Sequence, residues 1–514
     1  MTFSGTISLS DLNDYIAPSQ ACVVALNGAK VQLKLDSDLG QVQLQPRSAA
    51  QAPHPASSQQ VPPGEAIKVT LHDCLACSGC ITSAETVLLQ HQSSDEFLAK
   101  LQDPAATVIV SVSPQSRAAL AAFYNLPQLE TLQRLSGWLK GLGVTAVLDD
   151  TLAHDISLLE TAAEFISSYG SAPGMQCAAP LPMLASACPG WVCYAEKTHG
   201  ELVLPHISSA KSPQAVMGTL IKRLCVQQWA EADTAHSGGS SNGDGGSSSS
   251  SSRPATSRHV YHTSVMPCFD KKLEASREEL TVPGSGEGQA AEPEVDSSLT
   301  TSEVQALLQS QGVDLRTAPL GVLDTLLPAA MPAHLQHQHE LHGSAGSSGG
   351  YLEFVLRAAA WELFGKVVPP GPLPLKALRN PDMQEVCLLD DDGSVLLRFA
   401  AAYGFRNIQM LMRKLKTKRC EYQYVEVMAC PSGCLNGGGQ IKAGPGVSPA
   451  RLIEQLEQSY MQGVTPRHPA HSPLTSAVYT TIVGGGCFSP TAQDLFHTTY
   501  RKREKTVTSA IGDW

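Results

Sequence analysis

Two cysteines in the stretch 424–440 are placed where they could hold a metal. The stretch begins as an alternating run typical of a β-strand, breaks at Cys430-Pro431 and ends in three glycines. Cys430 and Cys434 are four residues apart, so one helical turn beginning at Pro431 would place both sulfurs on one face. The glycines would let backbone N–H groups approach the sulfurs and stabilise negative charge there. The alternative is a tight turn that carries two buried thiols.

Cys74, Cys77 and Cys80 form a second group with C-x2-C-x2-C spacing. Bacterial ferredoxins use this spacing to hold a [4Fe–4S] cluster, whereas zinc sites prefer two separated pairs of ligands. The Cys-Pro that usually follows after three more residues is missing, so the fourth ligand must come from elsewhere. Cys22 is the only other cysteine before residue 104, although on its own it could also be a small buried hydrophobic residue.

Two further cysteines, Cys188 and Cys268, each follow a run that is typical of a buried strand. In parallel α/β folds, ligands bind beyond the carboxyl ends of the strands. Together with Cys430 and Cys434, these cysteines supply four thiolates, which is the number that a second [4Fe–4S] cluster needs.

The pattern of the elements predicts an α/β fold. Strand-like runs at 107–112 and 144–148 alternate with helical patterns at 116–142 and from 151 to about 168. A further helix is expected at 351–364, with strands at 395–401 and 420–427 beyond it. Alternation of this kind is typical of parallel sheets covered by helices.

Composition limits the classes of function. With 514 residues, 42% hydrophobic and 16% charged, the chain is long enough for two or three packed units. The net charge of −11 argues against nonspecific binding to nucleic acid or membranes, and no apolar run reaches the length of about 18 residues that a membrane span needs. Fourteen cysteines without a secretory leader pattern indicate a cytosolic chain whose cysteine clusters bind metal.

Stretches rich in Gly, Ser and Pro suggest where the chain divides. Residues 1–104 are expected to form an N-terminal Fe–S module that contains an irregular insert. Two lobes follow at 105–230 and 258–446, separated by a disordered Gly/Ser insert at 231–257, and the second lobe has flexible inserts near 283–297 and 334–350. A C-terminal segment with a docking tail is expected at 447–514. Histidines at 334–342 and Cys487 have no assigned role.

Three stretches resemble, in order, the signature loops of iron-only hydrogenases. They read Ser-Ala-Cys-Pro-Gly-Trp at 186–191, Met-Pro-Cys-Phe-Asp-Lys-Lys-Leu-Glu at 266–274, and Glu-Val-Met-Ala-Cys-Pro-Ser-Gly-Cys-Leu-Asn-Gly-Gly-Gly-Gln at 426–440. The resemblance implies two parallel-sheet lobes around a buried [4Fe–4S] cluster held by Cys188, Cys268, Cys430 and Cys434. In that family the cysteine matching Cys434 also bridges to a diiron site. Met266 and Lys271 match residues around that site.

Ala187 departs from the hydrogenase pattern. Hydrogenases carry a cysteine there that passes protons to the diiron site, and an alanine methyl cannot carry a proton. The alanine, together with the N-terminal sequence up to Cys22, is similar to narf-like relatives of the hydrogenases, which act in cytosolic iron–sulfur protein assembly. In that subfamily a second cluster uses four cysteines that match Cys22, Cys74, Cys77 and Cys80.

This resemblance implies a protein without hydrogenase activity that binds two [4Fe–4S] clusters. It would link early scaffold proteins to the late cytosolic iron–sulfur targeting complex and deliver clusters to cytosolic and nuclear apoproteins, with no nucleic-acid or membrane partner. The expected location is the cytoplasm, with the nucleus left open. Asp513 and Trp514 resemble the acidic-aromatic tails that dock onto the targeting complex, although Gly512 departs from that pattern.

The sequence allows two alternatives to an assembly protein. The first is an active hydrogenase, which Ala187 argues against, and the second is a nuclear interaction protein in which the clusters serve only structure. Close to the cluster, Lys271, Glu274 and Glu426 are expected either to form a structural ion pair or to transfer protons.

Overall fold

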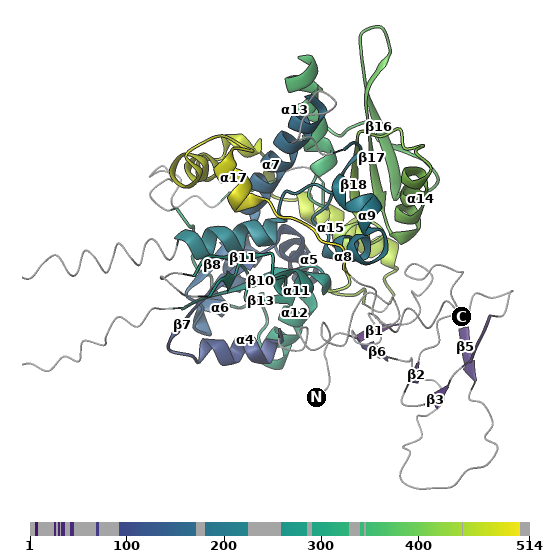
Figure 1. Cartoon of the computed structure of the whole chain (residues 1–514). Coiled ribbons are helices and arrows are strands. Elements are labelled where there is room, and N and C mark those ends of the chain that lie inside the picture. The colour runs from purple at the N-terminus through teal and green to yellow at the C-terminus, as the bar shows by residue number, and fades with distance from the viewer. Residues whose placement is uncertain are drawn as a thin grey trace, which may run out of the picture. The chain divides into compact units, whose positions relative to one another are not determined.

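The computed structural model describes residues 92–170, 180–224, 259–284, 290–327, 340–343, 346–444 and 446–503, with six short strands between residues 6 and 70. The chain divides into two compact units, Val87–Glu504 and Met1–Thr86 with Lys505–Trp514. The smaller unit, Met1–Thr86 with Lys505–Trp514, contains three antiparallel strand pairs. They are β1 (Thr6–Ser8) with β6 (Lys68–Thr70), β2 (Ala25–Leu26) with β3 (Ala29–Lys30), and β4 (Gln32–Leu35) with β5 (Val42–Gln45) (Figure 1).

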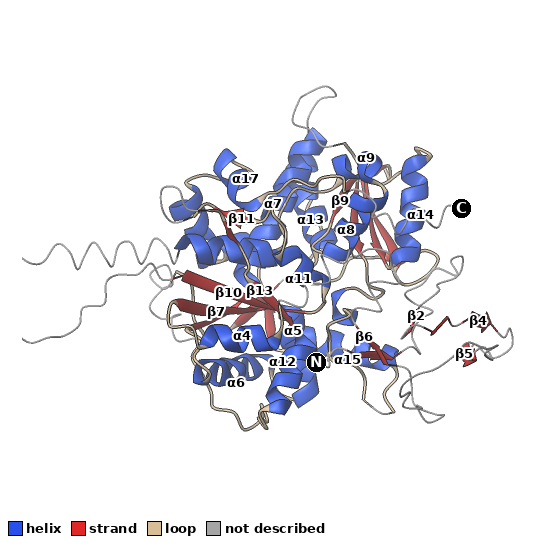
Figure 2. Ribbon diagram, turned by 60° about the horizontal axis from the view of Figure 1, so that its bottom comes forward, coloured by secondary structure: helices blue, strands red, loops and turns tan. Residues whose placement is uncertain are grey.

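The first sheet of the larger unit is parallel throughout. Its order is β13-β10-β7-β8, formed by β13 (Ser297–Thr300), β10 (His259–Met266), β7 (Ala106–Val112) and β8 (Ala146–Asp149). The strands are almost continuously buried, as expected for a sheet covered on both faces. One face packs under α4 (Ser94–Leu101), α5 (Pro114–Tyr124), α6 (Gln128–Gly141) and α12 (Thr301–Ser310) (Figure 2).

The second sheet is mixed. Its order is β15-β16-β17-β18-β9, formed by β15 (Lys376–Ala377), β16 (Met383–Leu389), β17 (Val395–Tyr403), β18 (Tyr424–Met428) and β9 (Met183–Ala185). The strands β17, β18 and β9 are parallel, whereas β15 and β16 are antiparallel to their neighbours. Only a short Asp-rich turn joins β16 to β17, and so short a connection allows only an antiparallel pair.

The long helix α7 (Thr151–Gly170) joins the two sheets. Leu152 and Ile156 pack against the first sheet, whereas Ala162 and Phe165 pack against the second. Next to α7, α13 (Tyr351–Phe364) covers the same face of the second sheet, and α8 (Pro189–Thr198) and α14 (Phe405–Lys416) cover the opposite face. One helix therefore contributes to both hydrophobic cores.

Shorter elements complete the larger unit. They are α9 (Gly200–Val203), α11 (Asp270–Ala275), α15 (Pro449–Met461), α16 (Pro473–Ala477), α17 (Pro490–Phe496), and the strand pairs β11 (Thr281–Val282) with β12 (Glu292–Pro293) and β14 (Leu341–Gly343) with β19 (Val464–Pro466). None of the helices in the described part of the chain combines the length and the apolarity that a membrane span requires.

The expected α/β fold class is confirmed, but some local expectations differ from the structure. The helix expected at 116–142 is two helices, because Asn125 adopts a left-handed conformation (φ 52°) and Pro127 follows it. The predicted insert near 283–297 includes β12, the buried Val295 and the start of β13. The stretch is rich in turn-forming residues, so the sequence did not predict β13, which becomes buried by pairing with β10.

The buried ion pair between Arg277 and Glu196 predicts a large stability effect. The guanidinium donates to both carboxylate oxygens at 2.6 and 3.2 Å, and Glu196 is completely buried. Replacing Glu196 by Ala leaves the buried guanidinium with only the more distant carboxylate of Glu279, at 3.7 Å, so we expect a loss of roughly 3 kcal/mol in the free energy of unfolding. Urea unfolding followed by circular dichroism measures it. Lys502→Ala breaks an exposed pair with Glu201 and is the control; an equal loss in both variants would contradict the prediction.

Candidate iron–sulfur site

Four cysteines lie at the carboxyl ends of three strands. Cys188 follows β9 and precedes α8, Cys268 lies between β10 and α11, and Cys430 and Cys434 follow β18. The strands β9 and β18 are parallel neighbours, so the first and third loops leave the second sheet at the same edge. Because β10 belongs to the first sheet, the three loops meet between the two sheets.

These loops bring all four cysteines to one pocket. It is lined by Ala187, Cys188, Pro189, Pro267, Cys268, Asp270, Lys271, Met428, Cys430, Gly433, Cys434 and Gly437. In the described residues, no group of three or more Cys, His, Asp or Glu side chains is arranged to hold a single metal ion. Zinc draws its ligand sulfurs to about 2.3 Å from one ion, whereas a [4Fe–4S] cluster is larger and takes its four thiolates on separate irons. The four thiolates are the ligand set that a [4Fe–4S] cluster needs.

Close backbone contacts join the second and third loops. A side chain at Gly437 would lie 2.3 Å from the carbonyl oxygen of Pro267, and one at Gly439 would lie 2.6 Å from Thr300. The amide of Gly439 donates to the carbonyl of Pro267 at 3.0 Å. Only glycine allows this approach, so the glycine run after Cys434 serves loop packing.

The segment between Cys430 and Cys434 is not the helical turn that the spacing suggested. Ser432 and Gly433 have positive φ angles of 56° and 74°, and a 3₁₀ turn begins only at Cys434. These two residues reverse the chain, while both cysteines still line the pocket. Side chains from elsewhere hold the turn: Asp382 accepts from the amide of Ser432 at 2.7 Å, and Ser348 accepts from the amide of Cys434 at 3.1 Å.

The pocket opposes thiolate formation in the absence of a metal. Burial, followed by the charge of Asp270 and the neighbouring cysteines, raises the pKa of Cys268 well above its ordinary value. Burial also raises the pKa of Cys434 to about 12, with Cys188 adding to the increase and Lys271 opposing it. A positively charged cluster core would remove this penalty, because it binds the deprotonated sulfurs. The amide of Ala429 already donates to the sulfur of Cys188 at 3.4 Å.

Three charged residues expected near the site separate into two groups. The ammonium of Lys271 binds the carboxylate of Glu274 at 2.9 Å, and the hydroxyl of Ser212 contacts both residues. Glu426 instead accepts from the hydroxyl of Tyr403 and the amide of Leu352, each at 2.7 Å. The expected ion pair therefore exists between Lys271 and Glu274, and Glu426 binds other partners.

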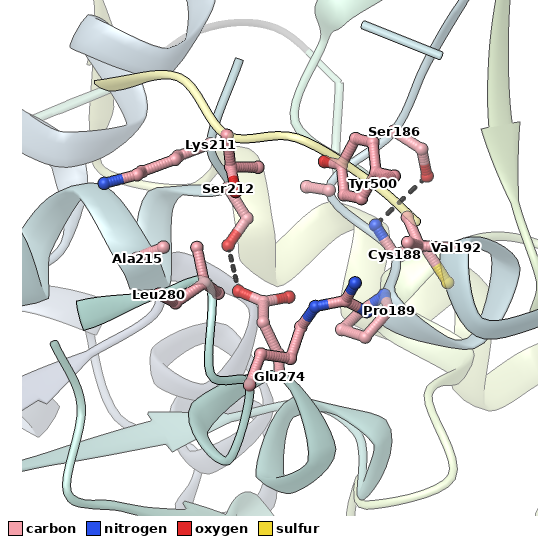
Figure 3. Close-up of a pocket in the computed structure, with 13 residues that line it drawn as sticks. Ser186, Cys188, Pro189, Val192, Lys211, Ser212, Ala215, Glu274, Leu280 and Tyr500 are labelled. Carbon is pink, nitrogen blue, oxygen red and sulfur yellow. Dashed lines mark hydrogen bonds between the residues drawn. The ribbon is translucent and has the colours of Figure 1, made fainter. Parts of the chain in front are cut away.

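Met266 and a second cavity complete the surroundings. Met266 is buried at the end of β10 but does not line the cysteine pocket. The second cavity adjoins that pocket through Ala187, Cys188 and Pro189 and is also lined by Lys211, Glu274 and Tyr500 (Figure 3). Ser186 accepts from the amide of Cys188 at 3.0 Å, which holds the first loop in place.

Several of these residues were not found from the sequence. Ser348 and Ser347 fall within the insert expected near 334–350, yet both are buried and Ser348 contacts the third loop. Asp382 and Ser212 are far from any cysteine in the sequence. A Pro-Gln pair after Ser212 resembles a helix start, but nothing local to these residues indicates a cluster.

The remaining predicted site residues lie outside the described residues. They are Cys22, Cys74, Cys77 and Cys80 of the N-terminal module and Asp513 and Trp514 of the tail.

Comparison with known proteins identifies the family. The model for the iron-only hydrogenase large subunit, C-terminal domain, matches residues 106–236 and 248–438. Protein NAR1 of Arabidopsis thaliana is 43% identical over 518 residues, covering 100% of this chain and 99% of that protein. Cytosolic iron-sulfur assembly component 3 of Mus musculus is also 43% identical, with 100% and 99% coverage. The chain belongs to this hydrogenase-like family of cytosolic iron–sulfur assembly proteins. The expected narf-like membership is confirmed.

Solved structures agree with this family at the level of the fold. Structures of [FeFe]-hydrogenase HydA1 from Chlamydomonas reinhardtii superimpose with a TM-score of 0.62 over 80% of this chain and 99% of the hydrogenase. Sequence identity is 23%, so the likeness concerns the fold alone. The fold of the two sheets and their covering helices is thus common to this chain and to the hydrogenases.

Asp150, close to this site, should make the stability of the fold depend on pH. Its carboxyl is buried at the start of α7, and one oxygen has no hydrogen-bond partner. Burial, followed by the charge of Asp149, raises its pKa to about 7. Because the pKa is higher in the folded than in the unfolded chain, the folded protein holds this proton more tightly. The stabilisation that results is complete at low pH and is lost as the pH rises towards 7.

We therefore expect Asp150→Asn to flatten the pH profile. Relative to wild type, its free energy of unfolding should increase by roughly 3 kcal/mol between about pH 5 and about pH 8, because Asn cannot ionise. Urea unfolding at several pH values measures this difference. Asp494→Asn, at an exposed position, is the control and should run parallel to wild type. A parallel profile for Asp150→Asn as well would show that the carboxyl is already ionised at pH 5.

Proposed function

We propose that this protein binds two [4Fe–4S] clusters and acts as an adaptor in cytosolic iron–sulfur protein assembly. It would link early scaffold proteins to the late targeting complex and serve cytosolic and nuclear apoproteins. The observation that carries the proposal is the convergence of four cysteines from three strand ends on one buried pocket. Full-length relatives named as cytosolic iron–sulfur assembly proteins support it.

In this proposal Cys188, Cys268, Cys430 and Cys434 hold the buried cluster. The cluster would supply iron and sulfide as cargo or carry single electrons when bound. The chain's own residues set its environment: burial raises the pKa of Cys434, the cation of Lys271 opposes that rise, and the amide of Ala429 donates to the sulfur of Cys188. Cys188 is buried, and Cys268, Cys430 and Cys434 are half-buried between the two sheets, which limits the access of water to the site. These features favour a stably held cluster.

The proposal does not include hydrogen turnover. Ala187 lines both the cysteine pocket and the adjoining cavity, and its methyl group can neither accept nor donate a proton. Glu274 faces the adjoining cavity, but its carboxylate is already bound by Lys271 and Ser212. We therefore assign the Lys271–Glu274 pair to the structure of the site.

The second cluster is assigned to Cys22, Cys74, Cys77 and Cys80. The assignment rests on the C-x2-C-x2-C spacing and on the family resemblance, because these residues lie outside the described residues. The proposed location is the cytoplasm. The tail residues Asp513 and Trp514 are assigned to docking on the targeting complex.

Iron and acid-labile sulfide per chain test the two-cluster proposal. After anaerobic purification, wild type should contain about eight irons and as many sulfides, and Cys268→Ala or Cys430→Ala should contain about half of each. Cys193→Ala is the control, since Cys193 is buried in the helix after Cys188 but does not line the pocket. Zinc, or less than about one iron per chain after anaerobic reconstitution, would refute the proposal.

Trp514→Ala tests the docking tail separately. We expect at least about a tenfold loss of affinity for the purified targeting complex, because a buried aromatic anchor often contributes more than 2 kcal/mol. Iron content should not change. Trp361→Ala removes another tryptophan, 58% exposed on α13, and should bind like wild type. Equal affinities for Trp514→Ala and wild type would assign the docking to another surface.

A further inference from the structure

The outer face of α14 carries an unusual concentration of positive charge. Six cations lie between residues 406 and 419, and all six are exposed: Arg406, Arg413, Lys414, Lys416, Lys418 and Arg419. The sequence from 393 to 420 contains no Asp or Glu, although the whole chain has a net charge of −11. We call these six residues the basic face.

The cations of the basic face have no carboxylate partner in the part of the chain that the structure describes. Among the described residues, no carboxylate lies within ion-pair distance of any member of the basic face, whereas the buried Lys211, Lys272 and Arg277 each bind one. Lys414 alone has a contact of another kind, with its ammonium 4.7 Å from the ring centre of Tyr422. Their mutual repulsion is therefore uncompensated within the described structure.

Helix chemistry accounts for only part of this pattern. Cations in the last turn, such as Arg413 and Lys416, are stabilised by the helix dipole. Arg406 is in the first turn, where the dipole disfavours a cation, and Lys418 and Arg419 lie beyond the end of the helix. Local stability therefore does not explain the complete set.

The basic face is attached directly to the lobe that carries the cysteine loops. The opposite side of α14 buries Ile408, Leu411 and Met412 in the same hydrophobic core as Cys188. Both views show α14 on the outside of the five-stranded sheet (Figures 1 and 2). At its start, Gly404 approaches Pro431 of the third loop. A partner bound on this face would rest on the same lobe as the cysteine pocket.

We propose that the basic face of α14 is a docking surface for an acidic polypeptide segment of a partner protein. Charge complementarity carries this inference: six exposed cations on a chain with a net charge of −11 attract carboxylates at long range and repel basic partners. A membrane is disfavoured because the apolar side of α14 is already buried. Nucleic acid is disfavoured because residues 404–419 expose no aromatic side chain for stacking, and the net charge of −11 repels a dense polyanion.

Docking at the basic face depends on charge and packing and requires neither cluster. The basic face could therefore fail to bind acidic segments while the protein holds two clusters, and it could bind them if the protein holds none.

Binding of a fluorescent peptide of alternating Glu and Ser to the full-length protein tests it by anisotropy. The test variant combines Arg413→Ser, Lys416→Ser, Lys418→Ser and Arg419→Ser. The matched control combines Lys376→Ser, Arg379→Ser, Arg451→Ser and Arg501→Ser, which removes the same charge from four other exposed positions. Circular dichroism and iron content establish that both variants fold.

We expect the test variant to bind the peptide at least about tenfold more weakly than wild type at about 50 mM salt, and the control less than about twofold more weakly. Raising the salt to about 200 mM should weaken wild-type binding, because the Debye length shortens. Equal losses in the two variants, or no peptide binding by wild type, would overturn the proposal. Tighter binding of single-stranded RNA or of phosphatidylserine vesicles, lost in the test variant, would also overturn it in favour of that ligand.

Discussion

The position of the candidate site depends on how α7 packs. This helix buries its first turns against the four-stranded sheet and its later turns against the five-stranded sheet. It therefore fixes the distance between the carboxyl ends of β10 and those of β9 and β18. Because interiors are close-packed, a shift of α7 would displace one set of cysteine loops relative to the other. Four thiols from three loops can meet only while both contacts hold.

Charge is the second constraint on this pocket. Four thiols, Asp270 and the Lys271–Glu274 pair lie close together in a buried volume, where an unpaired anion is costly. The free thiols avoid the cost by remaining protonated, as their raised pKa values indicate. A bound cluster would replace the protons with iron. The pocket is thus suited to two states, a neutral one with thiols and a loaded one with thiolates.

The first cysteine loop separates two cavities. Its Ala187 lines both the cysteine pocket and the second cavity. The proposed assignment, in which the four cluster ligands are kept and the proton carrier is absent, would suit a family with members named for assembly. The likeness of fold alone would not have distinguished these roles, because one fold supports several functions.

The sequence by itself was sufficient to predict the α/β class and the placement of the cysteines at strand ends, because apolar periodicity and turn residues are local signals. It was also sufficient for the family, since the three loop stretches are long and specific. Only the tertiary structure decided which strands share a sheet: β9 and β18 pair although more than 200 residues separate them.

Tertiary contacts likewise decided the partners of the loops. Ser348 and Asp382 hold the turn at Cys430, Glu426 binds Tyr403, and the turn itself is left-handed at Ser432. None of these hydrogen bonds leaves a local pattern, because each joins groups that are distant in the chain. Spacing could place Cys430 and Cys434 near each other, but only packing against the rest of the fold determined how both sulfurs reach one pocket.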